Sequence, residues 1–117
     1  MKTDIIDAVI GGEQARFRLE RNQPFLIQQI EHKVGKSLFA LFRDIADGTW
    51  STRAFLPVLS AAHVGAPHRL MGSESVLVRR TLEGQPPGVY APLVAKVLEA
   101  HLFGLPEEEA TFTDAAA

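Results

Sequence analysis

Four histidines carry the side chains best suited to ligate a metal or transfer a proton near neutral pH. They are His32, His63, His68 and His101. A helical metal pair needs a spacing of about three or four residues, which these histidines do not have. His63 and His68 could meet through a loop, with Asp44 or Asp47 as a third ligand, but spacing alone is weak support. We therefore expect no metal and no cofactor, with His32 and His68 in solvent and His101 beside the core.

Two carboxylates, Asp44 and Asp47, lie three positions apart on one expected helix. Such a pair can work as acid and base when the two environments differ, but this one is expected on a solvated helix face. The hydroxyl residues match neither a G-x-S-x-G elbow nor an S-x-x-K motif. No lysine follows Gly11-Gly12, so this pair does not form a phosphate loop. No catalytic residue is predicted, and the chain is not expected to be an enzyme.

Composition excludes further classes of function. The 117 residues suit one domain, with 46% hydrophobic and 22% charged residues, a net charge of −2 and no cysteine. Disulfides and thiolate chemistry are therefore excluded. Arg79-Arg80 is accompanied by Glu74 and Glu83, so no strongly basic recognition helix is expected and no nucleic acid partner is predicted. The sequence also has no apolar run of membrane-spanning length and no signal-peptide pattern, which predicts a soluble intracellular protein without a membrane partner.

Residues 5–19 predict a β-hairpin around the two-residue turn Gly11-Gly12. This turn fixes the register, with Asp7 opposite Arg16 on the polar face. The expected apolar-face pairs are Ile6–Phe17, Ala8–Ala15 and Ile10–Glu13. Because an isolated hairpin is marginal in water, the rest of the chain must cover its apolar face.

About five short helices follow, separated by glycines and capped by small polar residues. The first, fourth and fifth are expected over 23–34, 74–82 and 89–103; the second lies between a Ser37 cap and Gly48, and the third runs from a cap at Ser51 or Thr52 to about Ala62. Asn22 and Ser73 are the expected caps of the first and fourth helices, and Pro57 predicts a kink or a later start of the third. The sequence therefore predicts one small α+β domain over residues 1–104. Residues 105–117 carry four acidic and no basic residues and are expected to form a disordered tail.

Several large apolar residues lie outside the expected helical stripes. They are Phe25, Phe39, Trp50, Leu70 and Met71. For any single one, a place at the edge of the core is the commoner outcome. As a set they predict a partner-binding patch, because aromatic residues and methionine are enriched where proteins bind one another.

The order of these elements, and the residues at which the helices begin and end, resemble the pattern of a known family. A glycine-turned hairpin precedes a helix with Glu31 before Gly35, and Ser37-Leu38, Gly48 and Ser51-Thr52 follow. Over roughly residues 5–103 this pattern resembles the tail assembly chaperone family of gene transfer agents and related tailed phages. The chain departs from that pattern at Pro57 and at Gln85-Pro86-Pro87.

The resemblance implies a non-enzymatic chaperone in the cytoplasm of a bacterial host cell. Its implied partner is the tape measure protein during tail tube assembly, with the tail tube protein as a second candidate. Such proteins are generally absent from the finished particle, and the family has no catalytic residues to carry over. The resemblance leaves open a homo-oligomer and a frameshift-extended form. The alternative is a generic helical protein-binding adaptor or a transcriptional regulator.

Overall fold

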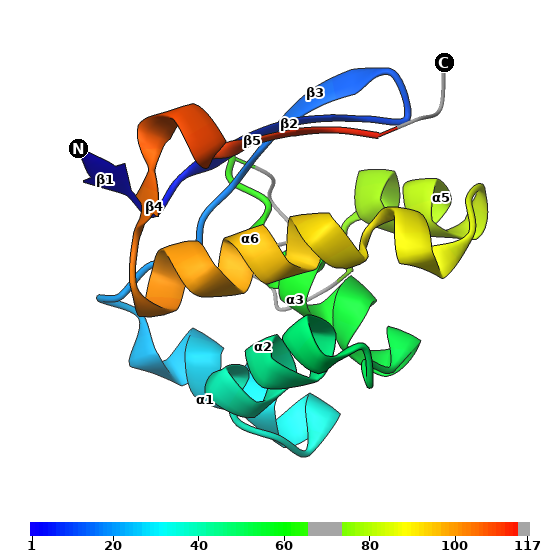
Figure 1. Ribbon diagram of the computed structural model, residues 1–117. Helices are drawn as coiled ribbons and strands as arrows, with labels where there is room; N and C mark the ends of the chain where they lie inside the picture. Colours follow the sequence, from blue (N-terminus) through cyan, green and yellow to red (C-terminus); the bar gives the residue numbers. More distant parts are fainter. Residues whose placement is uncertain (66–73, 115–117) are drawn as a thin grey trace.

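The structure is a computed structural model that describes residues 1–65 and 74–114 (Figure 1). These residues have the predicted α+β fold, in which helices pack against one side of a small sheet. The strands are β1 (Lys2–Thr3), β2 (Ile6–Ile10), β3 (Glu13–Phe17), β4 (Leu105–Pro106) and β5 (Thr111–Thr113). The α-helices are α1 (Pro24–Val34), α2 (Leu38–Asp47), α3 (Phe55–Ala62), α5 (Val76–Glu83) and α6 (Ala91–Leu102). Short 3₁₀ turns are η1 (Thr52–Ala54), η2 (Pro87–Val89) and η3 (Glu107–Glu109).

The N-terminal hairpin has the predicted register. Ile6 pairs with Phe17 and Asp7 with Arg16 across the antiparallel strands β2 and β3. Gly11 and Gly12 both have positive φ, which the tight turn requires and which glycine adopts without a steric penalty. The buried residues on one face of the hairpin are Ile6, Ala8, Ile10 and Phe17. The opposite face carries the Arg16–Asp7 ion pair, with 2.9 Å between Nε and Oδ1.

The helix ends follow local signals with small shifts. The Ser37 hydroxyl accepts a hydrogen bond from the Ala40 N–H and caps α2, as predicted. α1 begins one residue later than the expected Asn22 cap implies, because Gln23 is its N-cap residue. The third helix has the predicted later start: α3 begins at Phe55, which places Pro57 in its first turn, where no helical N–H bond is lost. The cap of α5 is Ser75, and the expected cap Ser73 lies outside the described residues.

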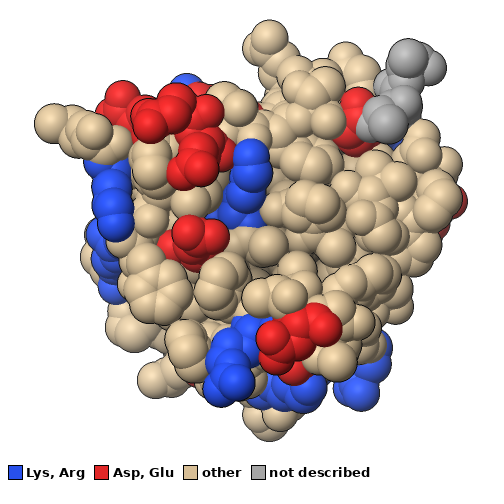
Figure 2. All heavy atoms as spheres, in the orientation of Figure 1, with Lys and Arg blue, Asp and Glu red and all other residues tan. Residues whose placement is uncertain are grey.

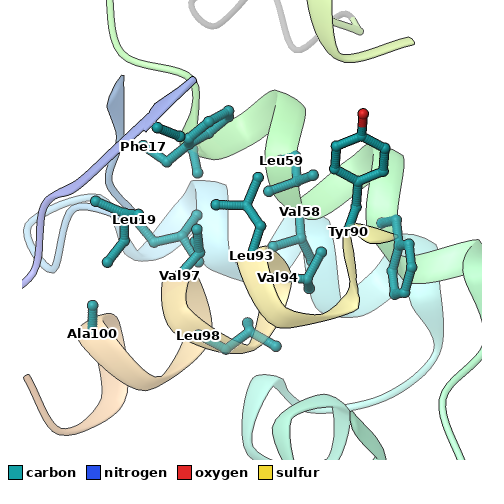
Figure 3. Close-up of a cluster of buried hydrophobic side chains, with 14 of the residues drawn as sticks. Phe17, Leu19, Val58, Leu59, Tyr90, Leu93, Val94, Val97, Leu98 and Ala100 are labelled. Atoms are coloured by element: carbon teal, nitrogen blue, oxygen red, sulfur yellow. The ribbon is translucent and has the colours of Figure 1, made fainter. Parts of the chain in front are cut away.

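The core is organised around α6, which lies between the sheet and the helices α1 and α2 (Figure 1). Leu93, Val94, Val97 and Leu98 are all buried along this helix. Figure 3 shows these side chains together with those of Phe17, Leu19, Val58 and Leu59 in one cluster. The hairpin therefore obtains the apolar cover that its sequence requires.

The expectation of a disordered tail over residues 105–117 is wrong for residues 105–114, and residues 115–117 lie outside the described residues. Residues 105–114 are ordered: β4 pairs with β1, and β5 adds to β2 as a parallel strand in the order β3-β2-β5. Leu105, Ala110 and Asp114 are buried. The segment is ordered because β2 has a free edge that needs backbone partners, and three apolar residues of the segment pack inward. Acidic composition predicted disorder because it does not reveal a long-range strand partner.

Candidate partner-binding surface

The structure places three of the five predicted binding residues on different elements. Phe25 lies in the first turn of α1 and is 71% exposed, and Phe39 lies in the first turn of α2 and is 48% exposed. Trp50 lies between α2 and η1 and is half-buried. Leu70 and Met71 lie outside the described residues. The predicted set is therefore distributed over separate elements.

Phe39 belongs to an aromatic cluster that sequence reasoning did not find. The Phe103 ring lies edge-on to Phe39, with 6.3 Å between centroids, and also to Phe42, with 6.0 Å. Edge-to-face contacts of this kind are favourable for aromatic rings. We call Phe39, Phe42 and Phe103 the aromatic ridge. Phe103 was missed because it follows the last helix directly, and nothing local shows that α6 ends beside the first turns of α2.

The aromatic ridge is open to solvent on a domain whose core is already filled. Phe103 is 54% exposed, close to the value for Phe39, while Phe42 is half-buried. Clustered exposed aromatic surface is characteristic of protein interaction sites, whereas scattered exposed apolar residues are ordinary. Figure 2 shows wide uncharged areas between separate groups of acidic and basic side chains on one face of the molecule. The ridge can bind apolar surface, but it offers no charged group for chemistry.

Trp50 forms one wall of a pocket of about 170 Å³ between α2 and η1, which we call the Trp50 pocket. Its ring lies against Phe55, with 5.2 Å between centroids. Apolar lining comes from Val34, Leu41, Ile45 and Phe55. The polar lining includes Lys36, Asp44, Ser51 and Arg53, of which Lys36 and Asp44 form an ion pair with 2.6 Å between Nζ and Oδ2. The pocket therefore has an apolar interior and a charged rim.

A wider hollow of about 530 Å³ lies against the sheet β3-β2-β5. It is lined in part by Asp7, Gln14, Arg16, Thr111 and Thr113, all of which are exposed. Polar side chains of this kind are what the solvent face of a small sheet normally carries. Val9, Ala15 and Phe112 add apolar lining, so the hollow has the mixed surface of an ordinary solvent-facing sheet.

The titratable residues make structural contacts. His63 Nδ1 lies 2.9 Å from the Ser75 hydroxyl oxygen, and that oxygen also accepts the Val78 N–H at the start of α5. His101 Nδ1 lies 2.7 Å from the carbonyl oxygen of Leu19. Asp44 is paired with Lys36 rather than with Asp47. Among residues 1–65 and 74–114, no group of three histidine or acidic side chains is placed to hold a metal ion.

Comparison with known protein families assigns the chain to one of them. A family model described as "Phage tail tube protein, GTA-gp10" matches residues 5–104. The chain belongs to this family. The GTA-gp10 match covers the hairpin and all of the described α-helices, and it ends just before β4. It supports a role in the tail of a phage or gene transfer agent, which is a non-enzymatic context.

The description of the GTA-gp10 family names a tail tube protein rather than a chaperone. No match was found among curated proteins or among solved structures. Within the part of the chain that the structure describes, no helix combines the length and apolar character needed to span a bilayer.

Proposed function

We propose that this chain is a non-enzymatic tail assembly chaperone of a gene transfer agent or phage-like particle. It binds the tape measure protein in the bacterial cytoplasm while the tail tube assembles. Family membership supports the tail context. The observation that carries the chaperone role is the aromatic ridge, because Phe39 and Phe103 expose about half of their surface although the core is already complete.

An exposed ridge of this kind suits reversible binding of a long apolar partner. Aromatic rings supply much contact area with few rotatable bonds, so little conformational entropy is lost on binding. A ridge of three rings is small, and one copy binds only a short segment. Many copies along one long chain would shield it together, and each copy could be displaced as tube subunits arrive. The remaining surface keeps charges of both signs, which favours solubility of the free chaperone (Figure 2).

A second candidate is a subunit of the tail tube itself, which the description of the family favours. A tube subunit must bind copies of itself in a ring and between rings, and it stays in the particle. A chaperone binds a different chain and leaves. The two candidates therefore differ in where the protein is found after assembly.

The test is co-expression with the tape measure protein encoded in the same gene cluster, followed by analysis of purified particles. We expect the chain to co-purify with the tape measure protein, to increase its soluble fraction, and to be depleted from finished particles. Quantitative mass spectrometry of lysate and particles gives the ratio. Stoichiometric retention in the particle would instead support a tube subunit. Failure to capture the tape measure protein would refute the proposed partner.

A further inference from the structure

The Trp50 pocket has the size of a single side chain. An apolar cavity of roughly 150 Å³ accommodates one benzene ring in a protein interior. The volume here, about 170 Å³, is therefore enough for one phenylalanine or leucine side chain. The Trp50 ring lies against Phe55 and is half-buried, so an inserted side chain would cover its remaining exposed face.

The rim of the pocket selects the charge of what binds. The charges of Lys36 and Asp44 compensate each other through their ion pair. Arg53 is exposed and forms no ion pair within residues 1–65 and 74–114, so the rim carries one uncompensated positive charge. The Ser51 hydroxyl accepts the backbone N–H of Arg53 and fixes the start of η1, which holds the arginine at the pocket. A carboxylate on the partner would complement this charge.

The elements around the pocket select a helical partner. All of its lining residues belong to α1, α2, η1, α3 or the connections between them. No strand of the described chain lines it, so a partner strand would find no sheet edge for its backbone groups. A helix satisfies its own backbone hydrogen bonds and inserts side chains into a groove.

We infer that the Trp50 pocket binds one apolar side chain, leucine or phenylalanine, of an amphipathic helix in the tape measure protein. That helix carries a glutamate or aspartate about one turn from the inserted residue, where it pairs with Arg53. The inference rests on the proposed function and names the chemistry of its partner segment. The pocket supplies selectivity for a particular segment, while the aromatic ridge binds apolar surface without selecting a sequence.

Trp50 provides a direct readout, because it is the only tryptophan of the chain. The experiment titrates the full chain with tryptophan-free peptides of about 20 residues, a length that supports helix formation, tiled along the tape measure protein. We expect a subset of peptides to shift Trp50 emission to shorter wavelength, as burial of the indole requires. These peptides should share a leucine or phenylalanine with an acidic residue about one turn away.

Charge reversal tests the role of Arg53. Arg53→Glu should lower the affinity for the selected peptides by at least about tenfold. Replacing the acidic residue of the peptide by lysine should restore binding to this variant. Arg43→Glu is the matched control, because Arg43 is an exposed arginine of α2 that does not line the pocket. Thermal melts should show both variants folded, since both positions are exposed.

Two results would overturn the inference without touching the proposed function. In one, the intact tape measure protein is captured but no peptide changes Trp50 emission. In the other, Arg53→Glu and Arg43→Glu lower the affinity for the peptides equally, which would show a general charge effect. Failure to capture the intact tape measure protein would refute the proposed function itself and the partner named here.

Discussion

The hydroxyl of Tyr90 donates a 2.7 Å hydrogen bond to Oδ2 of Asp114, which joins the start of α6 to the end of β5. The same carboxylate oxygen accepts the backbone N–H of Gly11 at 2.9 Å. Tyr90 is 1% and Asp114 8% exposed. Three distant segments, the hairpin turn, the start of α6 and the C-terminal strand, are therefore held together by one buried carboxylate.

Removal of residues 105–117 should destabilise the domain. The deletion leaves the β2 edge unpaired, removes buried Leu105 and leaves the Tyr90 hydroxyl without its acceptor. We expect the free energy of unfolding to fall by at least about 3 kcal/mol, measured by urea denaturation. Tyr90→Phe should account for about 1–3 kcal/mol of this loss. Glu108→Gln, an exposed change in the same segment, is the control. If the truncated chain unfolds at the same urea concentration as the full chain, β5 does not stabilise the fold.

Tyr90 should also make stability depend on alkaline pH. Burial raises the pKa of Tyr90 above its usual value, and Asp114 adds to the rise through its hydrogen bond and its negative charge. The unfolded chain therefore loses this proton first, at about pH 10, while the folded chain keeps it. The contribution of Tyr90 is complete below that pH and falls as the pH rises above it. The stability difference between wild type and Tyr90→Phe should shrink above about pH 10.

Ionisation of Tyr90 can be followed directly by absorbance, because Tyr90 is the only tyrosine of the chain. Its phenolate absorbance should appear only together with loss of the folded circular dichroism signal. A phenolate that forms near the ordinary tyrosine pKa in a folded chain would show that the hydroxyl is accessible to solvent.

Sequence reasoning succeeded where the deciding interactions are local. The Gly11-Gly12 turn fixed the pairing of Ile6 with Phe17, because a two-residue loop leaves a single register that puts the apolar face inward. Ser37 and Gly48 marked the two ends of α2 for the same reason: caps act within one turn. The approximate number and order of helices followed from such signals.

Sequence reasoning failed where contacts join distant parts of the chain. The parallel pairing of β5 with β2 and the contact of Phe103 with Phe39 leave no periodic signal in either segment. Phe39 was found because it lies off the stripe of its own helix, whereas Phe103 has no such local signature. The binding role of every candidate residue remains a prediction, because burial and exposure show what is available and not what binds.

Truncation of Phe17 should be among the most destabilising single substitutions in the chain. Its side chain is fully buried, pairs with Ile6 across the hairpin, and its ring lies 5.6 Å from that of His63. Phe17→Ala should lower the free energy of unfolding by about 3–5 kcal/mol. Phe17→Leu keeps most of the apolar volume and should cost clearly less. Equal losses for the two variants, measured by chemical denaturation, would argue against a tightly packed site.

Glu31 and Ser37 together should stabilise the corner between α1 and α2. A Glu31 carboxylate oxygen accepts the Leu38 N–H at 2.9 Å, and the Ser37 hydroxyl accepts the Ala40 N–H at 3.1 Å. Each substitution to alanine should cost about 0.5–2 kcal/mol, the usual range for loss of a helix cap. Because both side chains cap the first turn of α2, loss of one frays the turn that the other holds, so the double variant should lose less than the sum of the single losses. Gln28→Ala, an exposed change on α1, is the neutral control.

The aromatic ridge should matter more for binding than for folding. Phe39→Ser and Phe103→Ser each remove a half-exposed ring, so each should lower the free energy of unfolding by no more than about 1.5 kcal/mol. Each should weaken capture of the tape measure protein by more than about 1 kcal/mol, measured per folded molecule. Val76→Ser is the matched control, because Val76 is 78% exposed on α5 and lies outside the ridge. If Val76→Ser weakens capture as much as the ridge variants do, binding follows general hydrophobicity. If the ridge variants bind normally, the rings of Phe39 and Phe103 only pack the end of α6 against α2.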